Sequence, residues 1–225
     1  MSVDPLTILA QSAASWGEPL SSETFAAISS YLAFVREKNE SVNLTADANW
    51  DDLVLKHASD GVFAASVLRP RLPPAPRLLD LGSGAGFIGI VLKLVWPEAK
   101  VTLMESVERK YRFLNAAAMR TGLKDLRVLN RRAGSGAAAS SYELGQDAVI
   151  ERALAELPEA IRLSWPLLAP GGIFAAFQTE EPDPVSPPLV KAMVATGATV
   201  LQSCPYRRPK ESRDRRLVLF RRKED

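Results

Sequence analysis

One stretch, LLDLGSGAGFIGIVL at residues 78–92, constrains the fold more than any other part of the sequence. It begins as a buried-type strand, passes through four glycines and continues as an apolar helix. The glycines are Gly82, Gly84, Gly86 and Gly89. The first three allow a tight turn with positive φ and a close approach of the backbone to a ligand, and the fourth lets the helix pack against the strand. Such a strand–loop–helix unit is typical of an α/β fold with a parallel sheet.

The pattern along the rest of the chain agrees with that fold. Five β-rich runs alternate with helical segments, and two further strand-like runs then follow each other with no helix between them. The runs are 77–81, 100–105, 126–130, 147–151, 172–178, 198–204 and 215–222, and the helices are about 88–96, 107–121 and 157–168. We therefore expect a Rossmann-like, mostly parallel seven-stranded sheet with helices on both faces, closed by an antiparallel hairpin. The small and polar residues of the segment GSGAAASSY at 134–142 predict a loop.

The first 70 residues have a different character. Their apolar residues recur at helical spacing, as at Phe25, Ile28 and Leu32, and no β-type alternation is evident. The segment RPRLPPAP at 69–76 then places four prolines in eight residues, which breaks a helix and makes a stiff connector. This division predicts an N-terminal helical extension over 1–70 and a sheet-containing domain over 71–225.

Composition excludes several classes of protein. The chain has 225 residues, 47% of them hydrophobic, with one cysteine, Cys204, and one histidine, His57. An internal disulfide is impossible, and a His/Cys zinc site lacks ligands. No apolar run approaches the ~20 residues needed to span a bilayer, and the N-terminus lacks a basic residue before its apolar stretch. We expect a cytoplasmic monomer without a membrane anchor.

The glycine loop also predicts a cofactor. The helix after it offers unpaired N–H groups to an anionic group, which in S-adenosylmethionine is the methionyl carboxylate. Asp80, at the end of the strand, is placed to receive the methionyl ammonium, and Glu105, about 20 residues beyond the glycines, to bind the ribose hydroxyls. The same glycines also match GxGxxG, a weak dinucleotide-binding signal. We favour S-adenosylmethionine because the acidic residue precedes the glycines and the chain has no room for a second domain. The expected cofactor-binding residues are Asp80, Gly82, Ser83, Gly84, Gly86, Phe87, Glu105, Ser106 and Arg152.

Together with this loop, several motifs make the sequence resemble the GidB/RsmG family of bacterial 16S rRNA guanine-N7 methyltransferases over nearly its whole length. They are VNLTA at 42–46, LVLKHASD at 53–60, ERKYRFL at 108–114, DAVIERALAEL at 147–157 and RRLVLF at 215–220. The combination of Asn43, His57 and Arg152 with the glycine loop narrows the resemblance beyond methyltransferases in general. The resemblance implies a class I methyltransferase fold and a substrate in 16S rRNA or the assembling small ribosomal subunit.

The chain departs from the family pattern at three places. The family's glycine loop carries prolines where this chain has Ala85 and Ile88, and the family's Lys-Gly pair after the fifth strand is replaced by Gln178 and Thr179. The stretch after Arg132 lacks the family's acidic residues, so no adenine-binding residue is assigned. Two other functions therefore stay open: methylation of another RNA or a small molecule, and a non-catalytic RNA-binding assembly protein.

Guanine N7 attacks through an in-plane lone pair, so its methylation needs no general base, and positioning carries the catalysis. Arg152 is our candidate catalytic residue, because it ends the fourth strand, where open α/β sheets bind ligands. Asn43 and His57 have either a structural or a functional role. We expect the four scattered tryptophans to be core residues rather than platforms on which bases stack.

Charge is distributed unevenly along the chain. Residues 1–60 hold three Lys/Arg against nine Asp/Glu, whereas residues 207–225 hold nine Lys/Arg against four Asp/Glu. The basic C-terminal segment is either the contact to rRNA phosphates or a solvated face. Its candidate phosphate contacts are Arg207, Arg208, Lys210, Arg213 and Arg215.

Overall fold

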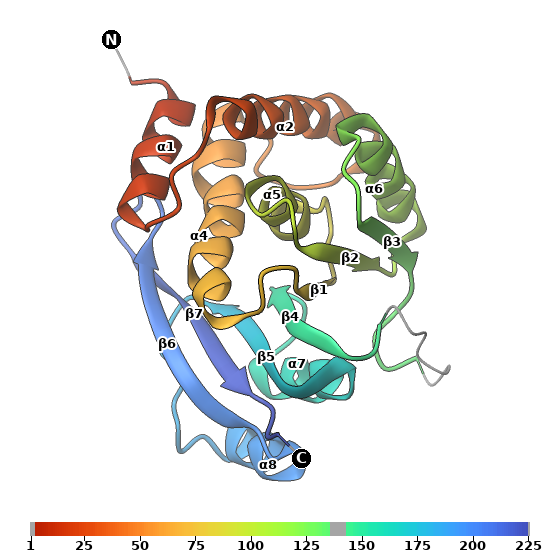
Figure 1. The fold of residues 1–225 in the computed structure, drawn as a ribbon, viewed down its shortest axis with the longest axis vertical. Helices are drawn as coiled ribbons and strands as arrows, with labels where there is room; N and C mark the ends of the chain where they lie inside the picture. Colours follow the sequence, from red (N-terminus) through yellow and green to blue (C-terminus); the bar gives the residue numbers. More distant parts are fainter. Residues whose placement is uncertain (1–2, 136–142, 225) are drawn as a thin grey trace.

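The computed structural model describes residues 3–135 and 143–224, so residues 136–142 of the expected loop lie outside the described residues. Within the described ranges seven strands form one sheet in the order β3-β2-β1-β4-β5-β7-β6 (Figure 1). The strands are β1 Arg77–Leu81, β2 Lys100–Glu105, β3 Leu126–Asn130, β4 Gln146–Arg152, β5 Leu168–Gln178, β6 Thr199–Arg207 and β7 Asp214–Arg221. Strands β1 to β5 run parallel, and β7 pairs antiparallel with both β5 and β6. The expected mostly parallel sheet with a closing hairpin is confirmed.

Helices cover both faces of this sheet (Figure 1). The α-helices are α1 Pro5–Ser15, α2 Ser22–Val42, α3 Trp50–Asp52, α4 Ser59–Leu68, α5 Phe87–Val95, α6 Glu108–Thr121, α7 Leu157–Ser164 and α8 Pro187–Thr196. A π-helical segment, η1, spans Leu53–Ala58, and 3-10 turns span Arg69–Arg71 and Trp165–Leu167. The sequence analysis did not predict α8. Its region is rich in proline, but Pro187 and Pro188 occupy the first turn of the helix, where their missing N–H groups need no partner.

The β1–α5 loop has the geometry that its glycines predict. Gly82, Gly84 and Gly86 have φ angles of 75°, 59° and 85°, in the left-handed region that favours glycine. A Cβ at Gly89 would overlap the Leu103 side chain on β2 and lie 2.9 Å from Asp80 Oδ2. Gly89 therefore allows α5 to pack directly on the ends of β1 and β2.

The N-terminal helices belong to the same core as the sheet. One hydrophobic cluster joins α1, α2 and α4 to α5, α6 and one face of the sheet, while α7 and α8 cover the other face with a second cluster. A Cβ at Gly61 in α4 would lie 2.7 Å from Val91 Cβ in α5, so these two helices are in close contact. The Tyr31 hydroxyl of α2 donates a hydrogen bond to the Ala85 carbonyl at 2.7 Å. The extension therefore supports the glycine loop directly.

Among the described residues, no helix combines the length and the apolar character needed to cross a membrane.

Candidate functional site

Two buried carboxylates hold the glycine loop at the carboxyl ends of β1 and β2. Asp80 Oδ2 accepts a hydrogen bond from Gly89 N at 2.9 Å. Glu105 accepts one from Gly84 N at 2.9 Å and another from Val107 N at 2.7 Å. Burial raises the pKa of Asp80 to about 6, against the opposing effects of the Gly89 hydrogen bond and the charge of Arg152. The loop conformation is thus fixed by the two carboxylates expected to face the cofactor.

A cavity of about 370 Å³ opens beside this loop, between the ends of β1, β2 and β3 and the segment after β4. Gly82 and Ser106 line it, together with Arg131, Arg132 and the segment at Leu154–Ala155. Its volume lies within the roughly 300–1,000 Å³ of typical small-molecule sites. Ser83 lies beneath the loop, where its hydroxyl donates to the Asp80 carbonyl at 2.8 Å.

A second, larger cavity of about 560 Å³ lies at the ends of β4 and β5. Arg152, Gln178 and Thr179 line it, together with His57 from the N-terminal extension. Ala155 lines both cavities, so the two hollows meet at the segment that follows β4. The smaller cavity beside the glycine loop and the larger cavity at the ends of β4 and β5 are therefore adjacent.

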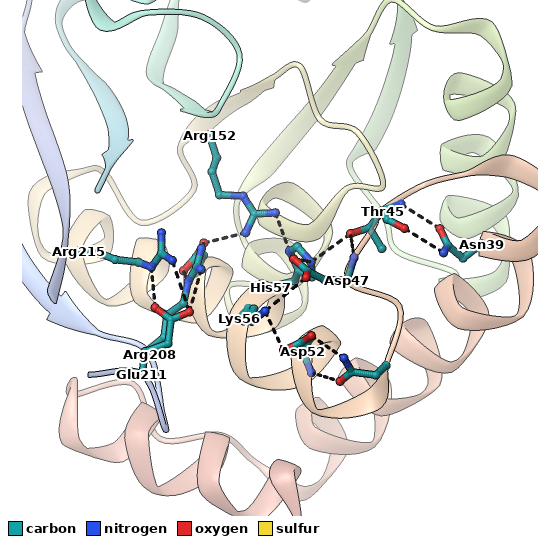
Figure 2. Close-up of polar contacts among 12 residues, drawn as sticks. Asn39, Thr45, Asp47, Asp52, Lys56, His57, Arg152, Arg208, Glu211 and Arg215 are labelled. Carbon is teal, nitrogen blue, oxygen red and sulfur yellow. Dashed lines mark hydrogen bonds and ion pairs between the residues drawn. The ribbon is translucent and has the colours of Figure 1, made fainter. Parts of the chain in front are cut away.

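Arg152 points from the end of β4 toward His57 (Figure 2). Its guanidinium donates to Asp60 Oδ2 at 2.7 Å and to His57 Nδ1 at 3.0 Å. An arginine only donates hydrogen bonds, so His57 Nδ1 must accept, which leaves the imidazole proton on Nε2. That nitrogen lies 3.3 Å from the Thr45 hydroxyl. Burial, reinforced by the charge of Arg152, lowers the pKa of His57 to about 4, so the ring is neutral at physiological pH.

His57 also connects the extension to the glycine loop. Its ring stacks on Phe87, the first residue of α5, with centroids 4.0 Å apart and planes within 7° of parallel. The Arg152 guanidinium lies 5.7 Å from the centroid of the same phenyl ring. Phe87, which the sequence analysis placed among the cofactor-binding residues, thus contacts the histidine, while a contact to cofactor stays a prediction.

Asp60 is the centre of a buried polar cluster. Besides Arg152, it accepts a hydrogen bond from the Tyr206 hydroxyl at 2.6 Å and two from Arg208, at 2.8 and 2.5 Å. Burial alone would raise the pKa of Asp60, but the hydrogen bonds and charges of the two arginines outweigh it and lower the pKa below its ordinary value. Arg208 is 8% exposed. Its expected role as a phosphate contact is therefore wrong, because its guanidinium faces Asp60 inside the molecule.

The other candidate phosphate contacts, Arg207, Lys210, Arg213 and Arg215, are exposed or partly exposed, and three of them are paired within the chain. Arg207 contacts Asp214 at 2.8 Å, Lys210 contacts Asp51 at 3.2 Å, and Arg215 contacts Glu211 at 2.8 Å. Figure 2 shows Arg215 and Glu211 together on the hairpin side of the cluster. Of the surface arginines, Arg215 also lines the larger cavity.

Other residues singled out in the sequence have structural roles. Asn43 ends α2 in the left-handed conformation with a φ of 52° and thus serves as its C-cap. Trp96 and Trp165 are buried, and Trp16 and Trp50 pack against the core. Sequence reasoning missed the cluster at Asp60 and missed Glu151. For Glu151 one signal was present, a carboxylate that directly follows the apolar run Ala148–Ile150 at the end of β4.

Comparison with known proteins agrees with this architecture. Two solved structures, the YcgJ protein from Bacillus subtilis and a methyltransferase from Pyrococcus furiosus, superpose with TM-scores of 0.55 and 0.53 at 13% and 15% identity. They cover 75% and 72% of this chain, and the matches span 100% and 83% of theirs. These likenesses show the fold, a class I methyltransferase sheet.

Sequence relatives are more specific. A protein named ribosomal RNA small subunit methyltransferase G from Acetivibrio thermocellus is 33% identical over 77% of this chain and 72% of its own length. One of the same name from Bacillus cereus is 30% identical over 92% of this chain and 86% of its own. The family model described as rRNA small subunit methyltransferase G matches residues 24–201. With most of its length covered by that model and by these relatives, the chain belongs to the rRNA small subunit methyltransferase G family.

Proposed function

We propose that this protein transfers a methyl group from S-adenosylmethionine to N7 of a guanine in 16S rRNA. The observation that carries the proposal is the pair of cavities that meet at Ala155, beside Arg152, in a member of this family. The smaller cavity, at the glycine loop, would hold the cofactor. The larger one would hold the acceptor base.

The residues of the loop-side site fit S-adenosylmethionine. A Cβ at Gly84 would meet no atom closer than 4.0 Å, so the space above the loop is open to a ligand. Asp80 would pair with the methionyl ammonium, the N-terminus of α5 would receive the carboxylate, and Glu105 would bind the ribose hydroxyls. Gly82 and Ser106 line the cavity that would hold the nucleoside. When bound, S-adenosylmethionine supplies an electrophilic methyl group.

The acceptor side needs positioning rather than proton transfer. N7 of guanine carries a free lone pair, so no base has to remove a proton, and correct orientation can contribute up to about 7–11 kcal/mol. The base would leave its RNA stack to enter the larger cavity, as bases generally do in enzymes that modify them. Arg152, held by Asp60 and His57, would orient the base there.

The test is methyl transfer to small-subunit particles from a strain that lacks the native activity, with the product mapped for N7-methylguanine. Wild-type protein should restore one methylated guanine. Arg152→Ala should reduce kcat/KM by the equivalent of about 1.5–3 kcal/mol, the usual value of a charge-assisted hydrogen bond. Cofactor affinity of the same variant distinguishes the two roles predicted for Arg152: a contact to the acceptor alone leaves it within a few-fold, whereas a contact to S-adenosylmethionine weakens it further. If no rRNA accepts a methyl group in any assembly state, although the cofactor binds, the acceptor is a small molecule or another RNA.

Gln178 provides a second test of the acceptor. It lines the same cavity as Arg152 and Arg215, the two cations that could take over the contact of the lysine that the family carries there. Gln178→Lys should therefore be tolerated or mildly activating in the particle assay. A strong loss of transfer in this variant would favour a different acceptor.

The proposed substrate also has consequences for the protein's partner and location. The exposed cations of the C-terminal segment, Arg207, Lys210 and Arg213, would contact rRNA phosphates. We further propose that the protein acts as a cytoplasmic monomer on the assembling small subunit. A single sedimentation species at micromolar concentration would agree with the monomer.

A further inference from the structure

Glu151, the residue before Arg152 at the end of β4, is a buried carboxyl group that neither the glycine loop nor the Asp60 cluster uses. Its side chain is 0% exposed, yet it lines the larger cavity. Oε2 accepts a hydrogen bond from Leu154 N at 3.1 Å. Oε1 has no hydrogen-bond partner within the part of the chain that the structure describes.

An unsatisfied buried carboxylate oxygen is costly, and native proteins rarely keep one without a reason. Burial, together with the negative charge of Asp80, raises the pKa of Glu151 to about 7. The nearest arginine in sequence, Arg152, is directed to Asp60 and His57 instead. The fold therefore holds an unneutralised carboxyl group at the cavity where the acceptor would bind, which is typical of a group that meets a ligand.

We propose that Glu151 reads the acceptor base and stabilises its methylated form, with Oε1 accepting a hydrogen bond from a ring or amino N–H of the guanine. This inference rests on the proposed function. Guanine presents two such donors on its Watson–Crick edge, N1–H and the exocyclic amine, on the side of the base away from N7. A carboxylate that accepts from this edge leaves N7 free to react.

The charge balance of the transfer favours a carboxylate at this position. The N7 lone pair forms the new bond to the methyl carbon while the carbon–sulfur bond breaks and its electron pair stays on sulfur. No proton moves, and the positive charge passes to the purine ring. That charge makes N1–H a stronger donor, so its hydrogen bond to Glu151 strengthens as the reaction proceeds, which is the condition for lowering the barrier.

Two other carboxylates, Asp47 and Glu156, line this cavity, and Asp47 forms an ion pair with Lys56. The titratable groups that line it with Glu151 and Arg152 are Asp47, His57, Glu156, Tyr206, Arg208 and Arg215. His57 is neutral, and Arg208 and Arg215 are cations. From β1, Asp80 adds the negative charge that disfavours ionisation of Glu151. Glu151 must lose its proton to act, so activity should rise with pH.

The experiment is a single-turnover pH–rate profile on small-subunit particles, from about pH 5.5 to about pH 8.5, with saturating S-adenosylmethionine. Wild type should rise about tenfold per pH unit below about 7 and then level off. Glu151→Gln keeps the shape of the side chain and an acceptor for Leu154 N. It should be at least about tenfold slower at pH 8 and nearly independent of pH above the pKa of about 6 of Asp80. Glu151→Asp should recover part of both the rate and the pH dependence. These expectations follow from loss of the charge alone.

The matched control is Glu18→Gln, the same change at a carboxylate that pairs with Arg69 far from the cavity. It should keep the wild-type profile. Two further measurements check that Glu151→Gln is correctly folded. It should bind S-adenosylmethionine as the wild type does, and it should still unfold in one cooperative transition. A Glu151→Gln variant with wild-type rate, or with the wild-type pH profile, would overturn the inference while the rRNA methyltransferase proposal stands. Absence of transfer by the wild type at every pH would instead overturn the proposed function, and this inference with it.

Discussion

Two buried carboxyl groups, Asp80 and Glu151, titrate close to neutral pH for the same physical reason. Each is buried at the end of a central strand, where loss of solvation disfavours the charged form. Hydrogen bonds from backbone N–H groups only partly offset that effect. Carboxyl groups kept in this state cost stability, and their retention is typical of functional sites.

The pKa of Asp80 predicts how cofactor affinity depends on pH. Since Asp80 must be ionised to pair with the methionyl ammonium, S-adenosylmethionine should bind more tightly as pH rises from about 5 through the pKa of about 6, and then level off. Calorimetry at several pH values measures this. Asp80→Asn should bind more weakly at pH 8 and lose the pH dependence. Equal wild-type affinities at pH 5 and pH 8 would show that Asp80 does not meet the ammonium.

The raised pKa of Glu151 predicts that replacing this residue with glutamine stabilises the folded protein at high pH. Its pKa is about 7 when folded and about 4.5 when unfolded, so between these values the unfolded chain ionises first and the folded state loses stability as pH rises. Glu151→Gln removes this penalty. At pH 8 it should raise the free energy of unfolding by about 1–3 kcal/mol, and near pH 4 it should have little effect. Urea denaturation of both proteins at the two pH values provides the comparison, and a variant less stable at pH 8 would contradict it.

At the scale of elements, Asp60 connects three parts of the fold. It lies in α4 and accepts hydrogen bonds from Arg152 at the end of β4 and from Tyr206 and Arg208 in and after β6. This arrangement fixes the N-terminal extension and the C-terminal hairpin around the larger cavity. The extension thus supplies one wall of the site.

Removal of Arg208 should therefore affect stability strongly. Arg208→Ala leaves the buried Asp60 with one cation instead of two, and breaking such a pair costs about 3–5 kcal/mol. Urea denaturation measures the change. The control is Arg207→Ala, whose ion pair with Asp214 is more than half exposed and should contribute less than about 1 kcal/mol. Similarly small effects in both variants would mean that the cluster adds little to the fold.

At the scale of the whole molecule, the N-terminal helices and the sheet share one hydrophobic core. Helix α5 is buried along its full length because α4 and α2 cover the side that faces away from the sheet (Figure 1). Removal of residues 1–70 would expose that apolar surface. A fragment of residues 71–225 should aggregate or show no cooperative thermal transition, whereas the full chain should unfold cooperatively. A stable fragment would establish the two predicted units as independent domains.

The surface charges of the whole molecule predict its salt dependence. Replacing Arg207, Lys210 and Arg213 with glutamine should reduce the slope of log affinity for rRNA against log salt by up to about 2–3 units, at about 0.7–0.9 for each phosphate that is no longer neutralised. Cofactor affinity should not change. Lys191→Gln on the exposed face of α8 is the control, with no effect expected. An unaltered slope in the triple variant would show that this segment is a solvated face.

The sequence by itself determined the sheet, its hairpin, the glycine loop and the family. These depend on local properties: periodic apolar residues, glycines that require positive φ, and motifs of a few residues. The bounds of the strands followed within a few residues, although β5 begins at Leu168 rather than at 172. Helix α8 was missed because prolines that start a helix look the same in sequence as prolines that break one.

Only the tertiary structure decided which charged residues are buried and what they contact. Arg208 lies in a basic segment that looks solvent-exposed in sequence, yet it bonds with Asp60, 148 residues away. Glu151 is adjacent to Arg152 in the chain, but alternation along β4 turns the two side chains to opposite faces of the sheet. Burial and partners of this kind arise from contacts between distant segments. A pattern read along the chain predicts that a charge is present but not what surrounds it.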